Sequence, residues 1–406
     1  MKSYWLWLFL LPTLFLPNFG YFDTGLGVLE TGDIMAIPIL ALLIIDPTKN
    51  RKYIYMDYIL RPGLAFVFWS VLGVLLIYFS YQYSKPNAIV SFSLLKIGKF
   101  AMYAAIPVII SRKLQFESIR NDFDWMILGA CLILGASTIL SPGHPSLKTE
   151  ATIDFYYKAL NLVSNVLAIF IIFLTGLLVV GYGAPRWRQA VKFSLIIILV
   201  GFSFTKGRGG WLAAVSGFVY LAYARGLLRA RVLVGIFACL IALGGLFIFN
   251  EEFRLEVSRL IISPSESANS SQIQVSDGER VMTWMNEIVK FPNAPIFGTG
   301  FHHRGGMTGL WWTGSHNFWL QIFLETGLIG GGLVILIFSR MWRHANGEES
   351  KKIGISIPLK AALVTAFVGG LGGEYFYGGM GLLAILLCYA PVGAHSVLRH
   401  HSTTQI

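Results

Sequence analysis

Charged residues are scarce in this chain of 406 residues, and cysteines are fewer still. Asp, Glu, Lys and Arg make up 13% of the sequence, against roughly a quarter in soluble domains. So few charges cannot cover a water-exposed surface, which excludes a soluble enzyme and a disordered tail. A disulfide-stapled secreted domain is excluded as well, because the three cysteines all lie in apolar runs, which is typical of small buried residues: Cys131, Cys239 and Cys388.

Apolar residues are abundant instead, at 55% of the chain, and they gather in long runs. A helix of about 20 apolar residues crosses a bilayer, and only such segments satisfy their own backbone hydrogen bonds in lipid. The sequence therefore predicts an all-α polytopic membrane protein with about twelve transmembrane helices. The candidate spans lie near residues 4–17, 25–45, 62–80, 90–111, 124–141, 159–182, 191–206, 209–224, 231–249, 316–339, 356–373 and 378–397.

The basic residues indicate which side of the membrane each loop faces. With both termini in the cytoplasm, about twice as many Lys and Arg residues fall in inner segments as in outer ones, as expected for a helical membrane protein with an even number of spans. The net charge of +11 is then mostly a topology signal. Because these charges are scattered over short loops, they do not form a nucleic-acid-binding face.

One long loop divides the predicted chain into three parts. Residues 1–249 hold nine predicted transmembrane helices, residues 250–315 form a large loop on the outer face, and residues 316–406 hold three more helices. Within the loop, Ser276 to Glu279 have capping-box spacing, and apolar residues follow at helical period. An amphipathic helix of about 277–291 is therefore expected on the membrane surface or over a cavity.

Cations gather near the outer face in two places. Lys206 and Arg208 lie in a glycine-rich outer turn, where cations are normally avoided, and glycines let backbone N–H groups approach a ligand. Arg280 lies in the first turn of the loop helix, where a cation opposes the helix dipole unless an anion shares the site. The three could bind a pyrophosphate; the alternatives are interface anchors in a re-entrant turn and a snorkelling arginine.

His316 lies where the loop re-enters the membrane, at the predicted outer start of a span. A histidine there can take a proton from a hydroxyl, although a structural role is the alternative. Nearby, His302, His303 and Arg304 add polar groups. Adjacent histidines cannot easily share one metal ion, and no third ligand has helical spacing, so neither a metal site nor a cofactor is predicted.

Several charges lie inside predicted spans, where they are expensive and usually paired or functional. Glu30 and Asp33 share one helix face, as do Lys96 and Lys99. Either these residues form a cluster that holds two helices together, or the lysines face an anionic ligand. Two further buried acids have no assigned partner, Glu325 and Glu374. Residues 122–124 (Asp-Phe-Asp) are interpreted as a solvated loop end.

These residues carry a resemblance to the bacterial O-antigen ligase family. The ligase signature is His, then Asn, Ser or Gln, nine residues, then Gly and a small residue; here His316 and Asn317 are followed by nine residues and Gly327, with Gly330 after it. Arg208 and Arg280 fall where that family carries its two arginines. The resemblance is best over roughly 200–335.

The resemblance implies a metal-independent, inverting glycosyltransferase of the C-type membrane class. It would move O-antigen polysaccharide from undecaprenyl pyrophosphate to a sugar hydroxyl of lipid A–core at the periplasmic face. Arg208 and Arg280 would bind the pyrophosphate with help from Lys206, and His316 would act as general base. Further substrate contacts are predicted at Asn317, His303, Arg304, Lys96 and Lys99.

Two other functions stay open from the sequence. An O-antigen polymerase would use the same lipid-linked donor and a similar arginine pair. A lipid or solute transporter would also have many spans with intramembrane charges, but it would carry them near the bilayer midplane and in related halves.

Overall fold

The computed structural model describes residues 10–15, 22–23, 28–29, 31–45, 57–80, 86–113, 117–140, 160–205, 207–227, 284, 288–289, 295–300, 317–373 and 381–390. Within these ranges nearly all regular structure is helical, as the sequence predicts. The exception is an antiparallel pair of two-residue strands, β1 (Phe22–Asp23) and β2 (Val28–Leu29).

The helices follow the apolar runs. Their bounds are η1 Leu11–Phe15, α2 Thr31–Ile45, α3 Asp57–Ser80, α4 Pro86–Lys113, α5 Glu117–Leu140, α6 Leu160–Val179, α7 Pro185–Phe204, α8 Arg208–Ala224, α13 Phe318–Ala345, α14 Glu348–Lys352 and α15 Ser356–Gly372, with a further apolar helix at Gly381–Ala390.

Several of these helices suit a membrane. Among the described residues, five are long and apolar enough to cross one, and five more are apolar but shorter. The number of twelve spans stays a prediction: residues 231–249 lie outside the described residues, and the run at 25–45 contains β2, so its helix begins only at Thr31.

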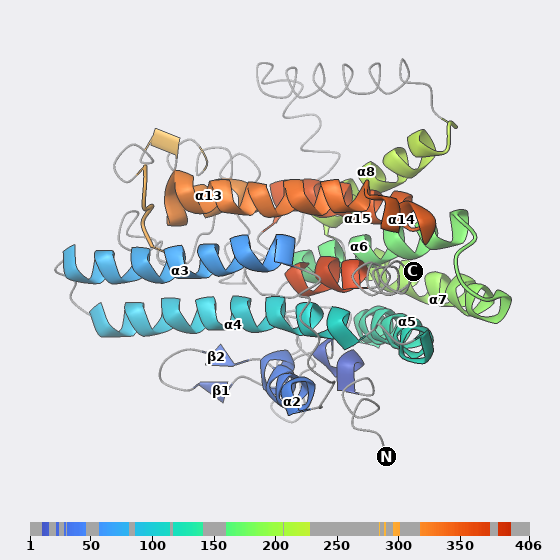
Figure 1. The fold of residues 1–406 in the computed structure, drawn as a ribbon, viewed down its shortest axis with the longest axis horizontal. Helices are drawn as coiled ribbons and strands as arrows, with labels where there is room; N and C mark the ends of the chain where they lie inside the picture. Colours follow the sequence, from blue (N-terminus) through green and yellow to red (C-terminus); the bar gives the residue numbers. More distant parts are fainter. Residues whose placement is uncertain are drawn as a thin grey trace, which may run out of the picture.

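The helices pack in two neighbouring groups. On one side α3 lies between α13 and α4, and α2 packs on α4 (Figure 1). On the other side α15 packs on α6 and α8, while α7 packs on α5 and α6. Small residues bring the second group close together: a Cβ atom added at Gly217 of α8 would lie 2.2 Å from the hydroxyl of Thr365. Such close approach is what stabilises helix pairs in lipid.

α13 is folded back on itself at Gly327. This glycine has φ +68° and ψ −172°, which no helix accommodates. The rings of Trp319 and Phe338 lie 5.0 Å apart, whereas a continuous helix would hold them about 28 Å apart. A Cβ atom at Gly331 would also lie 2.4 Å from the ring of Phe323. α13 therefore consists of a short limb, residues 318–326, that returns along a long limb, residues 328–345.

The fold-back changes the expected path of the predicted span over 316–339. The sequence predicted one straight span over 316–339 with His316 at its outer start. In the structure the long limb takes the place of the predicted span. Asn317, the residue after His316, caps the short limb at the end that lies away from the turn at Gly327. A single glycine with positive φ, inside an apolar run, is the physical reason for the difference.

Candidate functional site

The start of α8 holds the first candidate residue. Arg208 occupies the first helical position, after the N-cap residue Gly207, which provides no side-chain cap. The backbone N–H of Trp211 donates to the Gly207 carbonyl at 3.1 Å, which closes the first turn. The N–H groups before it lie at the positive end of the helix dipole. The predicted cation is thus placed at a helix start without a capping side chain.

Two glycines let this helix start sit deep in the bundle. A Cβ atom at Gly209 would lie 3.1 Å from the carbonyl oxygen of Gly372, the last residue of α15. At Gly210 it would lie 2.6 Å from the Cβ atom of Ser164 in α6. These glycines therefore serve helix packing, a role that the sequence by itself did not indicate.

The start of the short limb holds the second group. Asn317 is the N-cap residue, and its Oδ1 accepts a hydrogen bond from the N–H of Leu320 at 3.1 Å. Asn and Ser, two of the residues allowed at this place of the ligase signature, fit such a capping role, because short polar side chains are favoured at N-caps. His316 directly precedes this cap.

The last turns of α15 contact both helix starts. The indole Nε1 of Trp319, in the first turn of the short limb, donates to the carbonyl of Phe367 at 2.9 Å, and a Cβ atom at Gly370 would lie 2.8 Å from that nitrogen. Two residues later, Gly372 packs on Gly209. The structure thus brings the beginnings of α8 and of the short limb to the same end of α15.

A buried polar stripe runs along the short limb. Asn317, Gln321 and Glu325 recur every four residues and so share one helix face. The Gln321 side chain donates to Oε1 of Glu325 at 2.7 Å, and both residues are 1% exposed. Within the described part of the chain, Oε1 of Gln321 has no hydrogen-bond partner. From the sequence, Glu325 had no assigned partner and Gln321 was not predicted as a polar residue of the site. The spacing of four residues between them could have revealed Gln321.

The end of the long loop is anchored on the turn of α13. The N–H groups of Thr299 and Gly300 donate to the carbonyls of Leu324 and Glu325, both at 2.9 Å, and the N–H of Leu328 donates to Pro295 at 2.8 Å. The first two bonds satisfy carbonyls that the end of the short limb would otherwise leave unpaired, and the third ties the long limb to the loop.

Trp69 of α3 completes this anchor. Its Nε1 donates to the carbonyl of Thr326 at 2.9 Å, and its ring stacks on Phe297 with centroids 4.7 Å apart. A Cβ atom at Gly327 would lie 2.0 Å from the carbonyl oxygen of Ile296. Loop, α3 and fold-back therefore hold one another in place.

The residues of the ligase signature correspond to successive features of α13. Its polar residue caps the short limb, its nine residues are that limb, and its glycine makes the reversal. The small residues that follow leave room for the returning limb, since a Cβ atom at Gly330 would lie 2.2 Å from the Thr326 hydroxyl. In this chain the described part of the signature therefore comprises the cap, the short limb and its reversal.

The intramembrane charges of α2 and α4 are paired. Lys99 forms an ion pair with Asp33, whose other oxygen accepts a hydrogen bond from the Tyr103 hydroxyl at 3.1 Å. All three residues are buried. This is the pairing expected if the charges hold two helices together. Substrate binding by Lys99 and the half-buried Lys96 stays a prediction.

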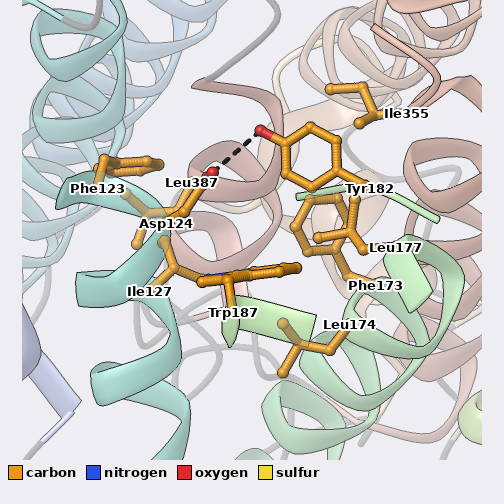
Figure 2. A pocket seen from close by; sticks show the side chains of 10 residues that line it. All are labelled: Phe123, Asp124, Ile127, Phe173, Leu174, Leu177, Tyr182, Trp187, Ile355 and Leu387. Carbon is orange, nitrogen blue, oxygen red and sulfur yellow. Dashed lines mark hydrogen bonds between the residues drawn. The ribbon is translucent and has the colours of Figure 1, made fainter. Parts of the chain in front are cut away.

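Asp124 lies in α5 rather than at a solvated loop end. It lines a small, mainly apolar pocket between α5, α6, α7 and the start of α15, and the Tyr182 hydroxyl donates to its Oδ2 at 3.1 Å (Figure 2). α5 begins at Glu117, so a polar first part of the helix precedes the apolar run and contains Asp124, which is why the expectation of a loop end was wrong. With an apolar lining the pocket has no site for a sugar nucleotide.

Several predicted site residues lie outside the described residues. Only the backbone of Arg208 is described, and of the predicted helix over 277–291 only residues 284 and 288–289 are described, as helical. Lying wholly outside are His316, Arg280, Lys206, His302, His303, Arg304, Glu30 and Glu374.

Comparison with protein families identifies the matching region. The family model described as O-antigen ligase matches residues 193–335. Comparison with curated proteins gives no match. The matched region runs from α7 through α8 and the long loop into the long limb of α13, and it includes Arg208, Arg280 and His316. Residues 193–335, which include the predicted site residues Arg208, Arg280 and His316, are therefore similar to the O-antigen ligase family, in agreement with the resemblance seen in the sequence.

Proposed function

We propose that this protein is an O-antigen ligase, within the broader class of membrane enzymes that process lipid-linked O-antigen. It transfers O-antigen polysaccharide from undecaprenyl pyrophosphate to a sugar hydroxyl of lipid A–core. The observation that carries the proposal is the family match over residues 193–335, because the same region supplies both helix starts that meet at the end of α15.

The start of α8 is the proposed donor side. Breaking the bond between the anomeric carbon and the pyrophosphate oxygen leaves a diphosphate whose charge needs fixed cations. Arg208 and Arg280 supply them, with Lys206 as a helper. The helix start behind Arg208 has no side-chain cap, so its N–H groups add positive potential at the same place.

The start of the short limb is the proposed acceptor side. His316 takes the proton of the acceptor hydroxyl as its oxygen attacks the anomeric carbon, and the carbon–oxygen bond to the diphosphate breaks on the opposite face. Direct displacement inverts the anomeric centre. Asn317, His303, Arg304, Lys96 and Lys99 are the proposed further contacts to the two substrates. Holding both lipids in line supplies much of the acceleration, and no metal ion takes part.

The charge distribution supports a periplasmic site. Arg208 opens α8, whereas Arg225 follows its other end and donates a hydrogen bond to the Val179 carbonyl. Arg188 lies near the same end, beside Gly181. If this arginine-rich end faces the cytoplasm, as basic loops normally do, Arg208 faces the periplasm of the inner membrane.

Transfer by the purified protein tests the proposal. In detergent, where no gradient exists, wild-type protein should attach lipid-linked polymer to lipid A–core, and the rate should be unchanged in EDTA. Absence of transfer would contradict the proposed glycosyltransferase activity and favour a transporter. Loss of transfer in EDTA would contradict the metal-independent mechanism.

A deletion strain separates the two glycosyltransfer reactions. A strain without the ligase should accumulate lipid-linked polymer that is not attached to lipid A–core. Single-repeat caps on lipid A–core would instead identify a polymerase.

A further inference from the structure

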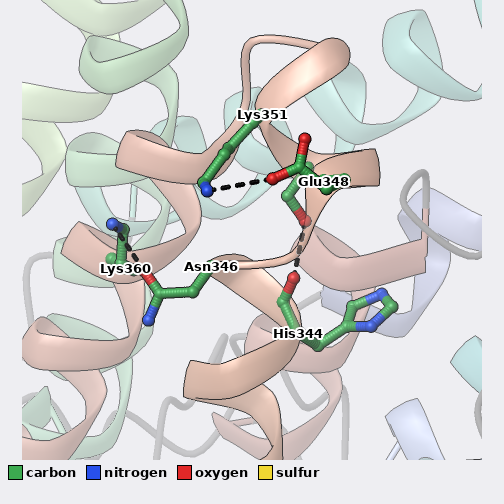
Figure 3. Close-up of polar contacts among 6 residues, drawn as sticks. His344, Asn346, Glu348, Lys351 and Lys360 are labelled. Carbon is green, nitrogen blue, oxygen red and sulfur yellow. Dashed lines mark hydrogen bonds and ion pairs between the residues drawn. The ribbon is translucent and has the colours of Figure 1, made fainter.

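A basic and aromatic corner lies where α13 turns through α14 into α15. We call Trp342, Asn346, Lys351 and Lys360 the inner corner (Figure 3 shows all but Trp342). The Lys360 ammonium donates to Oδ1 of Asn346 at 3.0 Å and lies 6.0 Å from the centroid of the Trp342 ring. A half-buried lysine is thus held in place by an amide oxygen and an aromatic face, neither of which carries a negative charge.

Positive charge exceeds negative charge around this corner. Lys351 lies near enough to Lys360 for the two ammonium groups to repel each other. Glu348 lies 3.2 Å from Lys351, but both side chains are more than half exposed, which weakens the pair. Residues 340–360 contain five Lys or Arg residues and only two Glu residues. The corner therefore attracts an anion.

The turn that carries the cations is rigidly built. The Ser350 hydroxyl donates to the carbonyl of His344 at 2.9 Å, and the N–H of Ile355 donates to the carbonyl of Ser350 at 3.0 Å. Ser350 is fully buried. Because α14 is fixed on both sides, Lys351 is presented next to Lys360 with little backbone freedom to lose on binding.

The depth of the corner matches a lipid headgroup region. Trp342 lies about one turn before the end of α13 and packs edge-to-face on Tyr220, about one turn before the end of α8, with centroids 5.9 Å apart. Trp and Tyr gather at this level of a bilayer, and cations beside them meet phosphates there. Trp342 is 36% exposed, so its ring is open to a lipid.

We propose that the inner corner binds the phosphate headgroup of an anionic phospholipid. The ammonium groups of Lys351 and Lys360 contact the phosphate oxygens, and the exposed edge of Trp342 packs on the lipid below its headgroup. Unlike the proposed transfer site at the start of α8, this site lies at the arginine-rich end and does not depend on the transfer reaction.

Lipid binding by the full chain tests the site directly. In phosphatidylcholine nanodiscs, added phosphatidylglycerol should bind to the wild-type protein, and Lys360→Gln should weaken this binding about fivefold or more, from the loss of one cation near the surface. Lys352→Gln is the matched control, because it removes the same charge from the exposed Lys352 of α14 and should leave binding near wild type. Equal losses in both variants would overturn the site in favour of diffuse attraction.

Two further measurements keep the test decisive. Inorganic phosphate at the same concentration should neither bind nor displace the lipid, and binding of phosphate alone would overturn the assignment to a lipid. Thermal unfolding in pure phosphatidylcholine should be the same for Lys360→Gln and wild type. If Lys360→Gln does not fold, the exposed variant Lys351→Gln takes its place, and undiminished lipid binding by it would overturn the proposal.

Discussion

The two helix starts that meet at the end of α15 differ in how they are capped. α8 begins at Gly207 and Arg208 without a side-chain cap, whereas the short limb of α13 begins with the side chain of Asn317 on the N–H of Leu320. An uncapped start keeps its positive potential for an anion, which suits a leaving diphosphate. A capped start has one of its donors satisfied, so it offers less positive potential to an anion than the start of α8 does.

The two starts also differ in how they are held. The first turn of α8 is wedged directly between α6 and α15, through Gly210 and Gly209. The short limb is held at its far end as well, where Gly327, the loop residues 295–300 and Trp69 are joined. The start of α8, the proposed donor side, thus depends on local packing, and the start of the short limb, the proposed acceptor side, depends on a turn about 13 Å away along the limb.

Removing the reacting groups should have the largest effect. His316→Ala, Arg280→Ala and Arg208→Ala should each lower transfer at least about 100-fold, because they delete the base or a cation of the developing charge. Transfer is measured in membranes alongside the amount of protein, which should stay near wild type. A parallel fall in protein amount would favour a structural role for the residue concerned.

Blocking the reversal should come next. Gly327→Ala places a Cβ atom 2.0 Å from the Ile296 carbonyl oxygen at a positive φ, and should lower the free energy of unfolding by at least about 2 kcal/mol and remove most transfer. The matched control is Gly332→Ala on the long limb, where a Cβ atom meets nothing within 4 Å. Thermal unfolding of both variants is measured; equal stability would contradict the fold-back.

Removing the cap should have a moderate effect on the acceptor side only. Asn317→Ala should cost about 1 kcal/mol of stability and lower the maximal transfer rate, because the start of the short limb loses the bond to Leu320. Asn317→Ser should restore both, since serine also caps. The comparison requires that the apparent affinity for the lipid-linked donor stay unchanged in Asn317→Ala; a weaker donor affinity would mean that Asn317 contacts the donor.

Trimming the remote anchor should have the smallest effect. Trp69→Phe removes the hydrogen bond to the Thr326 carbonyl and keeps an aromatic ring near Phe297, so about 1 kcal/mol of stability should be lost. Trp125→Phe, at a 46% exposed position of α5, should change the thermal unfolding temperature little. If both variants were equally stable, the anchor would not hold the short limb.

The sequence by itself determined the membrane class and most of the helices. Apolar runs of the required length mark α3 to α8 and α15, because lipid allows few other backbone arrangements, although α3, α5 and α7 begin several residues before the predicted spans. It also identified the ligase region, since the signature around His316 and Asn317 lies on a short stretch of chain. The pairing of Asp33 with Lys99 was one of two alternatives that the spacing allowed.

Only the tertiary structure determines that α13 folds back at Gly327 and that the starts of α8 and of the short limb both contact the end of α15. The apolar pattern of residues 318–345 cannot distinguish one straight helix from two limbs that pack on each other, because each limb is itself an apolar helix. The choice depends on φ at Gly327 and on partners far away in the chain, Trp69 and the loop residues 295–300. Likewise, contact between Gly209 and Gly372 joins residues that no local pattern relates, and it is what brings α15 to the start of α8.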